Sequence, residues 1–197
     1  MIIDLEGEES QILVNPKMPS KEQEEAFSHI KQYFTQLPAH VWLATSGSTG
    51  SAKWVALSKK ALLTSAKAVN AHLQSTAKDC WINPLPYFHV GGLGIYARSY
   101  LAKSKMIAYE EKWNPHTFVL QANANQATLS SLVPTQLYDI VKEGLTAPKS
   151  LRAIIIGGGS LSFFSISTRY GTRMETAPKL WINRMLFTSG NSGTWKS

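Results

Sequence analysis

The chain has 197 residues, 44% of them hydrophobic, and a formal net charge of +7. This length suits a domain with a substantial core, and no apolar run approaches the ~20 residues that a membrane-spanning helix needs. The single cysteine, Cys80, excludes a disulfide framework and a thiolate metal site, and it favours a cytoplasmic, reducing compartment. An acidic N-terminus also argues against a signal or transit peptide.

The charge is unevenly distributed along the chain. Most of the acidic residues lie within the first 25 positions, so the remainder is strongly basic. Such a balance suits anionic ligands such as ATP and coenzyme A, and it also suits nucleic acid. Nucleic acid is the less favoured partner, because no cluster of Lys and Arg with interleaved aromatic residues is present.

Residues 1–40 are predicted to form a lead-in followed by an amphipathic helix. The lead-in contains one short strand, Gln11–Val14. Ser20 and Gln23 fit a capping box at the start of the helix. Its apolar residues recur at helical spacing and form one stripe, comprising Ala26, Phe27, Ile30, Tyr33, Phe34 and Leu37.

A short buried strand, Val41–Thr45, opens into a loop of small residues that Lys53 closes. Glycine tolerates positive φ, so successive main-chain N–H groups can turn toward an anion, while hydroxyls and a lysine add donors and charge. The alternative is a flexible Ser/Gly hairpin. The preceding strand and an expected following helix favour phosphate binding by Thr45, Ser46, Gly47, Ser48, Thr49, Gly50 and Lys53.

Helices and strands alternate through the rest of the core, residues 41–162. The expected order is helix 58–78, strand 80–85, helix 91–102, strand 104–109, a helix from Pro115, strand 127–133, helix 134–142 and strand 151–156. This alternation predicts an α/β fold with a mainly parallel sheet and flanking helices. We expect the loops at 45–53, 87–92 and 157–159 to meet at the carboxyl edge of that sheet, where ligands bind.

Three further features in this core are candidates for binding. His89 lies in a loop framed by proline and glycine, although a lone histidine is more often structural. Arg98 is either a substrate-binding cation or a solvent-facing helix residue. Gly157, Gly158 and Gly159 follow a hydrophobic strand, where they either let a flat ligand approach the backbone or form a tight turn.

Two of these segments resemble motifs of the adenylate-forming enzymes. Thr45–Lys53 resembles their phosphate loop, T-S-G-[ST]-T-G-x-P-K, with Ala52 in place of the proline. Pro84–Leu93 resembles their acyl-pocket run, [LM]-P-x-[FY]-H-x-x-G-[LM]. Residues 88–99 and 127–137 resemble the o-succinylbenzoate–CoA ligases of menaquinone biosynthesis in particular.

The resemblance implies a ligase that uses ATP, Mg²⁺, a carboxylic acid and coenzyme A. In this family an acyl-adenylate forms first, and the coenzyme A thiol then displaces AMP. By this resemblance, the phosphate loop would hold the β- and γ-phosphates, Phe88 would line the acyl pocket, and His89 would lie beside the activated carboxylate as the candidate catalytic residue. Arg98 would suit a second carboxylate on the substrate. The segment Gly157–Gly159 would border the adenine.

The resemblance ends after Ser162, and residues 163–197 are interpreted as a divergent or altered-frame tail. The family pattern Y-G-x-T-E is displaced here, so Glu175 is not assigned as a magnesium ligand. Thr188–Lys196 repeats T-S-G-x-x-G-x-x-K without a following helix, which makes coincidence the favoured interpretation. The family's C-terminal domain and catalytic lysine are not found, so we predict that the chain is inactive alone. The alternatives are a non-catalytic nucleotide-binding remnant and a basic nucleic-acid-binding module.

Overall fold

The computed structural model describes residues 3–45, 53–158 and 185–187. They fall into two compact units. The first contains Met1–Gln74 and Pro86–Leu101, and the second contains Ser75–Leu85 and Ala102–Ser197. Both units combine strands with helices, and the larger sheet is parallel, which confirms the predicted α/β class.

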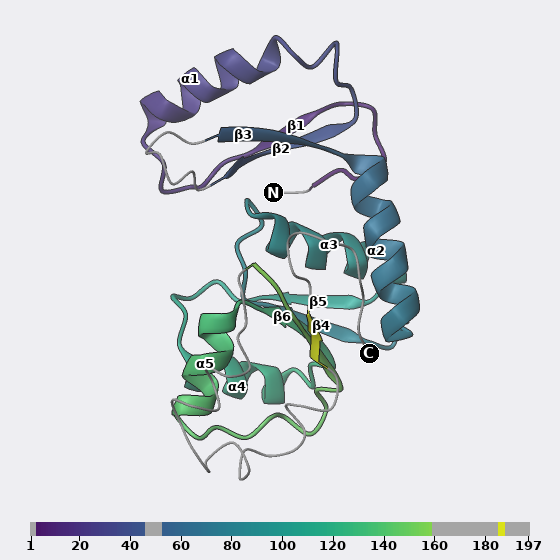
Figure 1. Ribbon diagram of the computed structural model, residues 1–197, viewed down its shortest axis with the longest axis vertical. Helices are drawn as coiled ribbons and strands as arrows, with labels where there is room; N and C mark the ends of the chain where they lie inside the picture. The colour runs from purple at the N-terminus through teal and green to yellow at the C-terminus, as the bar shows by residue number, and fades with distance from the viewer. Residues whose placement is uncertain (1–2, 46–52, 159–184, 188–197) are drawn as a thin grey trace. The chain divides into compact units, whose positions relative to one another are not determined.

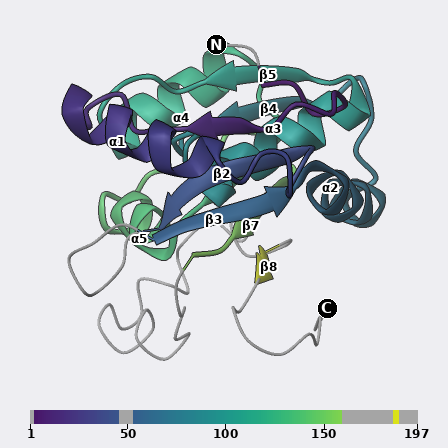
Figure 2. The ribbon, with the colours of Figure 1, turned by 90° about the horizontal axis from the view of Figure 1, so that it is seen from above.

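A three-stranded sheet forms one side of the first unit (Figure 1). Its strands are β1 (Gln11–Leu13), β2 (His40–Thr45) and β3 (Lys53–Ser58). Strand β1 pairs with β2 in parallel, whereas β2 and β3 are antiparallel neighbours, as Figure 2 shows. The helix predicted to follow the loop from Ser58 is present as the next element, but strand β3, which stands between the loop and that helix, was not predicted. Trp54 and Ala56 alternate toward the core, which makes Lys53–Ser58 suitable as a strand.

Helix α1 (Ser20–Lys31) packs on this sheet through Ala26 and Ile30, which contact Trp42 of β2. The predicted start of the helix was nearly correct, but the predicted capping box was wrong. Pro19 occupies the N-cap position, and the Gln23 side chain donates instead to the main-chain oxygen of Met18 at 2.7 Å. The apolar stripe rather than a cap therefore fixes this helix to the sheet.

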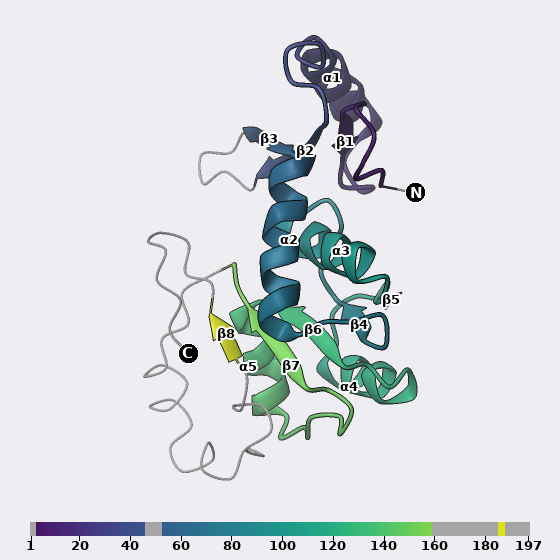
Figure 3. The ribbon, with the colours of Figure 1, turned by 90° about the vertical axis from the view of Figure 1, so that its right-hand side faces the viewer.

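Helices α2 (Lys59–Leu73) and α3 (Val90–Ala102) lie side by side in the first unit (Figure 3). The helix predicted from Ser58 is present, and Ser58 is its N-cap, with its hydroxyl oxygen accepting from the Ala61 N–H at 3.4 Å. The helix ends five residues earlier than the predicted Lys78, because Gln74 adopts the left-handed conformation with φ 51°.

The residues before β1 are part of the core of the first unit. Ile3 and Leu5 are almost fully buried in a cluster with Leu13, Val41, Leu43, Leu62, Leu93 and Ala97. The Tyr96 hydroxyl on α3 donates to the Ile3 main-chain oxygen at 3.0 Å. The N-terminal segment therefore contributes buried apolar area as well as a hydrogen bond.

The second unit contains a parallel sheet with strand order β5-β4-β6-β7-β8 (Figure 1). The strands are β4 (Cys80–Asn83), β5 (Lys105–Ala108), β6 (Leu129–Leu132), β7 (Ala153–Ile156) and β8 (Met185–Phe187). Strand β8 pairs with β7 and falls within the range that the sequence assigned to the tail. The four earlier strands occur where they were predicted, each shortened at one or both ends.

Two helices cover one face of this sheet, α4 (Pro115–Ala124) and α5 (Pro134–Lys142). Each begins at the proline that the sequence indicated, and Asn114 caps α4 by accepting from the Thr117 N–H at 3.0 Å. The core that they share with the strands is apolar and includes Ile82, Phe118, Leu132, Leu137, Ile140, Ile154 and Ile156. Gly144 follows α5 with φ +65°, a backbone conformation that glycine adopts without strain and that ends the helix.

A charged network ties together the amino-terminal ends of three strands of the second sheet. Arg152 donates to both carboxylate oxygens of Asp79, each at 2.9 Å, and the Thr128 hydroxyl donates to the same carboxylate at 2.7 Å. Burial alone would raise the pKa of Asp79, but hydrogen bonds from Arg152, Thr76 and Thr128 outweigh it and hold this pKa below its usual value. This network of Asp79, Thr128 and Arg152, the clamp of the second unit, therefore links the ends of β4, β6 and β7 through side-chain hydrogen bonds.

The existence of two sheets changes the interpretation of the candidate loops. The strand before Thr45 and the strand before Gly157 belong to different sheets, so the argument that their loops meet at one sheet edge was wrong. Within the second unit, Gly157 and Gly158 still follow the carboxyl end of a parallel strand. Among the described residues, no helix has the length and apolar character needed to cross a bilayer.

Candidate functional site

The predicted phosphate loop connects two directly paired strand ends. Thr45 and Lys53 face each other in the antiparallel ladder, and the Thr45 hydroxyl donates to the Lys53 main-chain oxygen at 3.1 Å. Both side chains are exposed. Ser46, Gly47, Ser48, Thr49 and Gly50 lie outside the described residues. The framework therefore places one hydroxyl and one ammonium at the two ends of the predicted anion-binding loop.

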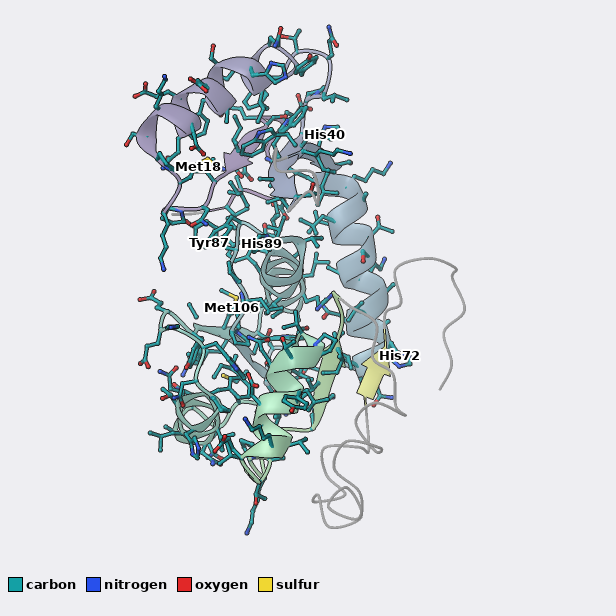
Figure 4. The ribbon with its side chains drawn as sticks, turned by 60° about the vertical axis from the view of Figure 1, so that its left-hand side comes forward. Met18, His40, His72, Tyr87, His89 and Met106 are labelled. Carbon is teal, nitrogen blue, oxygen red and sulfur yellow. The ribbon has the colours of Figure 1, made fainter. Side chains whose placement is uncertain are left out.

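His89 stands immediately before helix α3. Its main-chain N–H donates to the Pro86 oxygen at 3.1 Å, and its own carbonyl accepts from the Leu93 N–H at 3.0 Å. The proline therefore shapes the turn, and His89 supplies the first acceptor of the helix. Its ring is exposed beside Tyr87 and Phe88, and Figure 4 labels Tyr87 and His89 near the start of the helix. The structure leaves this imidazole accessible to a ligand.

Aromatic packing fixes the turn that carries His89. The Phe88 ring packs against the core of the first unit, and its centroid lies 5.5 Å from Tyr87 in an edge-to-face arrangement. The His89 ring centroid lies 4.8 Å from that of Phe88. One face of the predicted acyl-pocket segment therefore faces core side chains, while the histidine lies at its margin.

Arg98 lies on α3 with its guanidinium folded back along the helix. A Cβ added at Gly94 would be 3.3 Å from the Nη2 atom of Arg98 and 3.6 Å from its Cζ atom. Helical side chains point toward the N-terminus, so this guanidinium lies one turn nearer to His89 than its own Cα. Burial lowers its pKa to about 10, so the group remains protonated at neutral pH. Arg98 is therefore a partly desolvated cation, unlike an ordinary surface arginine.

Gly157 and Gly158 form the turn after β7. The Gly157 N–H donates to the Leu132 oxygen at 3.2 Å, which extends the ladder between β6 and β7 by one bond. Gly158 has φ +81°, and a Cβ there would lie 3.4 Å from a methyl group of Val133. A tight turn explains the glycine at 158 by itself. The predicted adenine contact remains a prediction, and Gly159 lies outside the described residues.

The N-terminus of α5 lies at the same edge of the second sheet. The Gln136 side-chain oxygen accepts from the Val133 N–H at 3.0 Å, and the Gln136 side chain is buried. Gln136 therefore satisfies a main-chain donor at the start of α5, which is a capping role. Thr135 is exposed beside it.

Metal binding has no visible basis in the described part of the chain. Within residues 3–45, 53–158 and 185–187, no group of three or more His, Cys, Asp or Glu side chains is placed to hold a metal ion. Glu175 and Thr188–Lys196 lie outside these ranges.

Three side-chain arrangements were not predicted from the sequence. Lys59, within the predicted helix 58–78, is 2% exposed, and its ammonium donates to the Gly7 oxygen at 2.8 Å. The contact between Gly94 and Arg98 was also missed, although their separation of four residues in a predicted helix could have indicated it. The third is Asn70, whose side chain donates to the Arg98 main-chain oxygen at 2.8 Å.

Comparison with protein families identifies the core. The family model described as "AMP-binding enzyme" matches residues 13–163. The chain belongs to the AMP-binding enzyme family. The match begins at the last residue of β1 and includes all the elements from α1 through β7, so it begins before the Val41 start that the motifs had indicated.

Curated relatives in this AMP-binding family carry one activity in their names. A 2-succinylbenzoate–CoA ligase of Bacillus cytotoxicus is 32% identical over 133 residues, which cover 66% of this chain and 27% of the relative. A protein of the same name from Staphylococcus epidermidis is 31% identical over 130 residues. The chain thus spans about a quarter of the length of these relatives.

Solved structures of AMP-binding enzymes confirm the fold. An o-succinylbenzoate CoA synthetase from Bacillus subtilis, in complex with its acyl-adenylate intermediate, matches with a TM-score of 0.65 at 21% identity. That match covers 81% of this chain and 52% of the other. Another structure of the synthetase from this organism, in complex with ATP and a magnesium ion, matches with a TM-score of 0.61.

Proposed function

We propose that this chain carries nucleotide- and acid-binding elements of an ATP-dependent acid–CoA ligase whose substrate is 2-succinylbenzoate. The Thr45–Lys53 loop binds the β- and γ-phosphates of ATP, and Gly157–Gly159 borders the adenine. His89 and Phe88 lie beside the carboxylate that is activated. Arg98 binds the second carboxylate. Coenzyme A is the co-substrate of the whole enzyme.

The observation that carries this proposal is the position of Arg98. A guanidinium matches a carboxylate with two parallel hydrogen bonds, and such pairs gain strength where water is partly excluded. The group lies over Gly94 on the helix that His89 begins, and it remains charged at neutral pH. A substrate with two carboxylates can therefore meet an imidazole and a guanidinium presented by one helix and the turn before it. The names of the curated relatives independently indicate such a diacid.

The residues of this chain contribute positioning and charge rather than covalent chemistry. ATP, when bound, would supply the adenylyl group: the carboxylate oxygen bonds to the α-phosphorus, and the bond to pyrophosphate breaks, so pyrophosphate leaves. Lys53 neutralises phosphate charge, and His89 orients the carboxylate by donating a hydrogen bond to it. Holding the reactants and stabilising charge are the dominant contributions in reactions of this type.

Calorimetric titration with ATP tests the nucleotide part of the proposal. We expect saturable binding that weakens about tenfold in Lys53→Ala, because one charge-assisted contact to phosphate is lost. Lys60→Ala is the matched control, since Lys60 is also exposed but lies outside the loop. Equal ATP affinity in the wild type and in Lys53→Ala would contradict the assignment of the loop.

Titration with 2-succinylbenzoate tests the acid part. We expect Arg98→Ala to weaken binding by tenfold or more, about 1.4 kcal/mol, and the exposed Lys67→Ala control to leave it unchanged. Pyrophosphate release from ATP in the presence of this acid measures turnover directly. We expect none from the 197-residue chain alone. ATP binding without acid binding would instead support the non-catalytic nucleotide-binding alternative.

A further inference from the structure

Helix α3 has no side chain at position 94, where the guanidinium of Arg98 lies. An alanine Cβ would be 3.3 Å from Nη2, tighter than most contacts of this kind, and the nearest atoms it would meet belong to Arg98 alone. Gly94 itself is buried. Glycine in a helix interior costs about 1 kcal/mol relative to alanine, so helix stability by itself would favour alanine at this position. The space is therefore used by the guanidinium.

The backbone that carries Arg98 is held by a second residue. The Asn70 side-chain amide on α2 donates to the Arg98 main-chain oxygen at 2.8 Å, and Asn70 is only 9% exposed. A buried hydrogen bond of this kind fixes the rotation and height of α3 against α2 at residue 98. One residue thus positions the main chain of Arg98, while Gly94 leaves room for its side chain.

We infer that Gly94 and Asn70 are positioning residues that set where the Arg98 guanidinium can meet a carboxylate, and so determine the preference for diacids over monoacids. This inference rests on the proposed function. The added methyl group of alanine at 94 would displace the guanidinium by a few tenths of an ångström at least. Bidentate pairing is sensitive to such shifts, whereas a carboxylate beside His89 is not affected by them.

A double-mutant cycle tests the inference with two acids. The probes are 2-succinylbenzoate and 4-oxo-4-phenylbutanoate, which lacks the carboxylate on the ring. We expect Gly94→Ala to weaken binding of the diacid about fivefold to tenfold and to leave the monoacid unchanged. In the Arg98→Ala background, Gly94→Ala should have no further effect, since it acts through Arg98. Equal weakening of both acids, or an undiminished effect without Arg98, would overturn the inference.

The role of Asn70 is tested with a substitution that preserves the shape of its side chain. Asn70→Asp removes the amide donor to the Arg98 oxygen, whereas Asn70→Gln retains an amide. We expect Asn70→Asp to reduce the preference for the diacid and Asn70→Gln to restore part of it. A preference that is unchanged in Asn70→Asp would contradict the role of this residue.

A measurement without ligand separates this inference from the proposed function. The Nε–H signal of Arg98, observed by nuclear magnetic resonance in the full chain, should shift in Gly94→Ala and exchange faster with water. An unchanged signal would overturn the placement of Arg98 by Gly94. If the wild type binds neither acid, the proposed function fails, and the Nε–H signal still decides whether Gly94 places the guanidinium.

Discussion

Polar side chains are paired and largely or partly buried in one region of the second unit, but those at the loop end and the turn of the candidate site in the first unit are exposed. In the second unit, Asp79 and Arg152 form a bidentate pair at the amino-terminal ends of the strands, and the carboxylate is largely buried. In the first unit, Lys53 and His89 are exposed, at a loop end and before a helix. Charge that is paired inside a sheet stabilises the fold, whereas charge presented at a turn is available to a ligand. Substitution of Asp79 should therefore change the free energy of unfolding, whereas substitution of Lys53 should change ligand affinity.

The largest effect should come from breaking the clamp of the second unit. We expect Asp79→Ala to lower the free energy of unfolding by about 3 kcal/mol, because it leaves Arg152 and two further donors without their acceptor. Urea denaturation measures this change as a lower midpoint. Glu110→Ala is the control, since it removes an exposed carboxylate from the same unit. A midpoint shift as small as that of the control would show that the clamp is not important for stability.

Lys59 provides a smaller effect in the first unit. Its side chain is 3% exposed, and its ammonium lies 3.6 Å from Asp4 and 2.8 Å from the Gly7 oxygen. We expect Lys59→Ala to lower the free energy of unfolding by about 2 kcal/mol through the lost hydrogen bond and packing. The adjacent Lys60→Ala, at an exposed position, should change it by less than 0.5 kcal/mol, as is usual for surface substitutions. Indistinguishable unfolding curves for the two variants would refute the structural role of Lys59.

The smallest expected effect is a loss of folding stability at acidic pH, which does not occur at neutral pH. The folded pKa of Asp79 is below its ordinary value, so the unfolded chain binds a proton more readily than the folded one. The stability that this carboxylate contributes is fully present above about pH 4, near the unfolded pKa, and is lost as pH falls through the folded value. Thermal melts between pH 5 and 2.5 should therefore show a steeper decline for the wild type than for Asp79→Asn. Parallel declines would rule out the linkage.

The elements that could be predicted from the sequence are those whose ends are set by single residues acting on their own backbone. Pro115 and Pro134 begin helices, Ser58 caps one and Gly144 follows one, because each acts on its own backbone. Strand β3 was missed because a Ser/Gly loop and a lysine suggested a phosphate loop leading into a helix. The alternation from Trp54 onward is brief, and its antiparallel partner is set by tertiary pairing.

The residues of the candidate site likewise divide into those that local motifs indicated and those whose environment depends on the whole fold. Lys53, His89 and Arg98 were named from their motifs, and the structure adds the exposure of Lys53 and His89 and the orientation of the partly buried Arg98. Lys59 was not found, because its burial depends on contacts with Asp4 and Gly7, more than 50 residues away. The assumed single sheet edge also failed, since strand order within sheets is a property of the whole fold.

The direct pairing of Thr45 with Lys53 has a consequence for protein engineering. The register of β2 and β3 is fixed over six residue pairs, so the seven residues between their ends can be exchanged while the scaffold keeps its alignment. Loop closure is tolerant of length, since doubling it costs only about 0.6 kcal/mol. A library randomised at 46–52 could therefore be selected for new anions on an unchanged frame. The hairpin formed by β2 and β3 could thus accept a grafted loop between its strands.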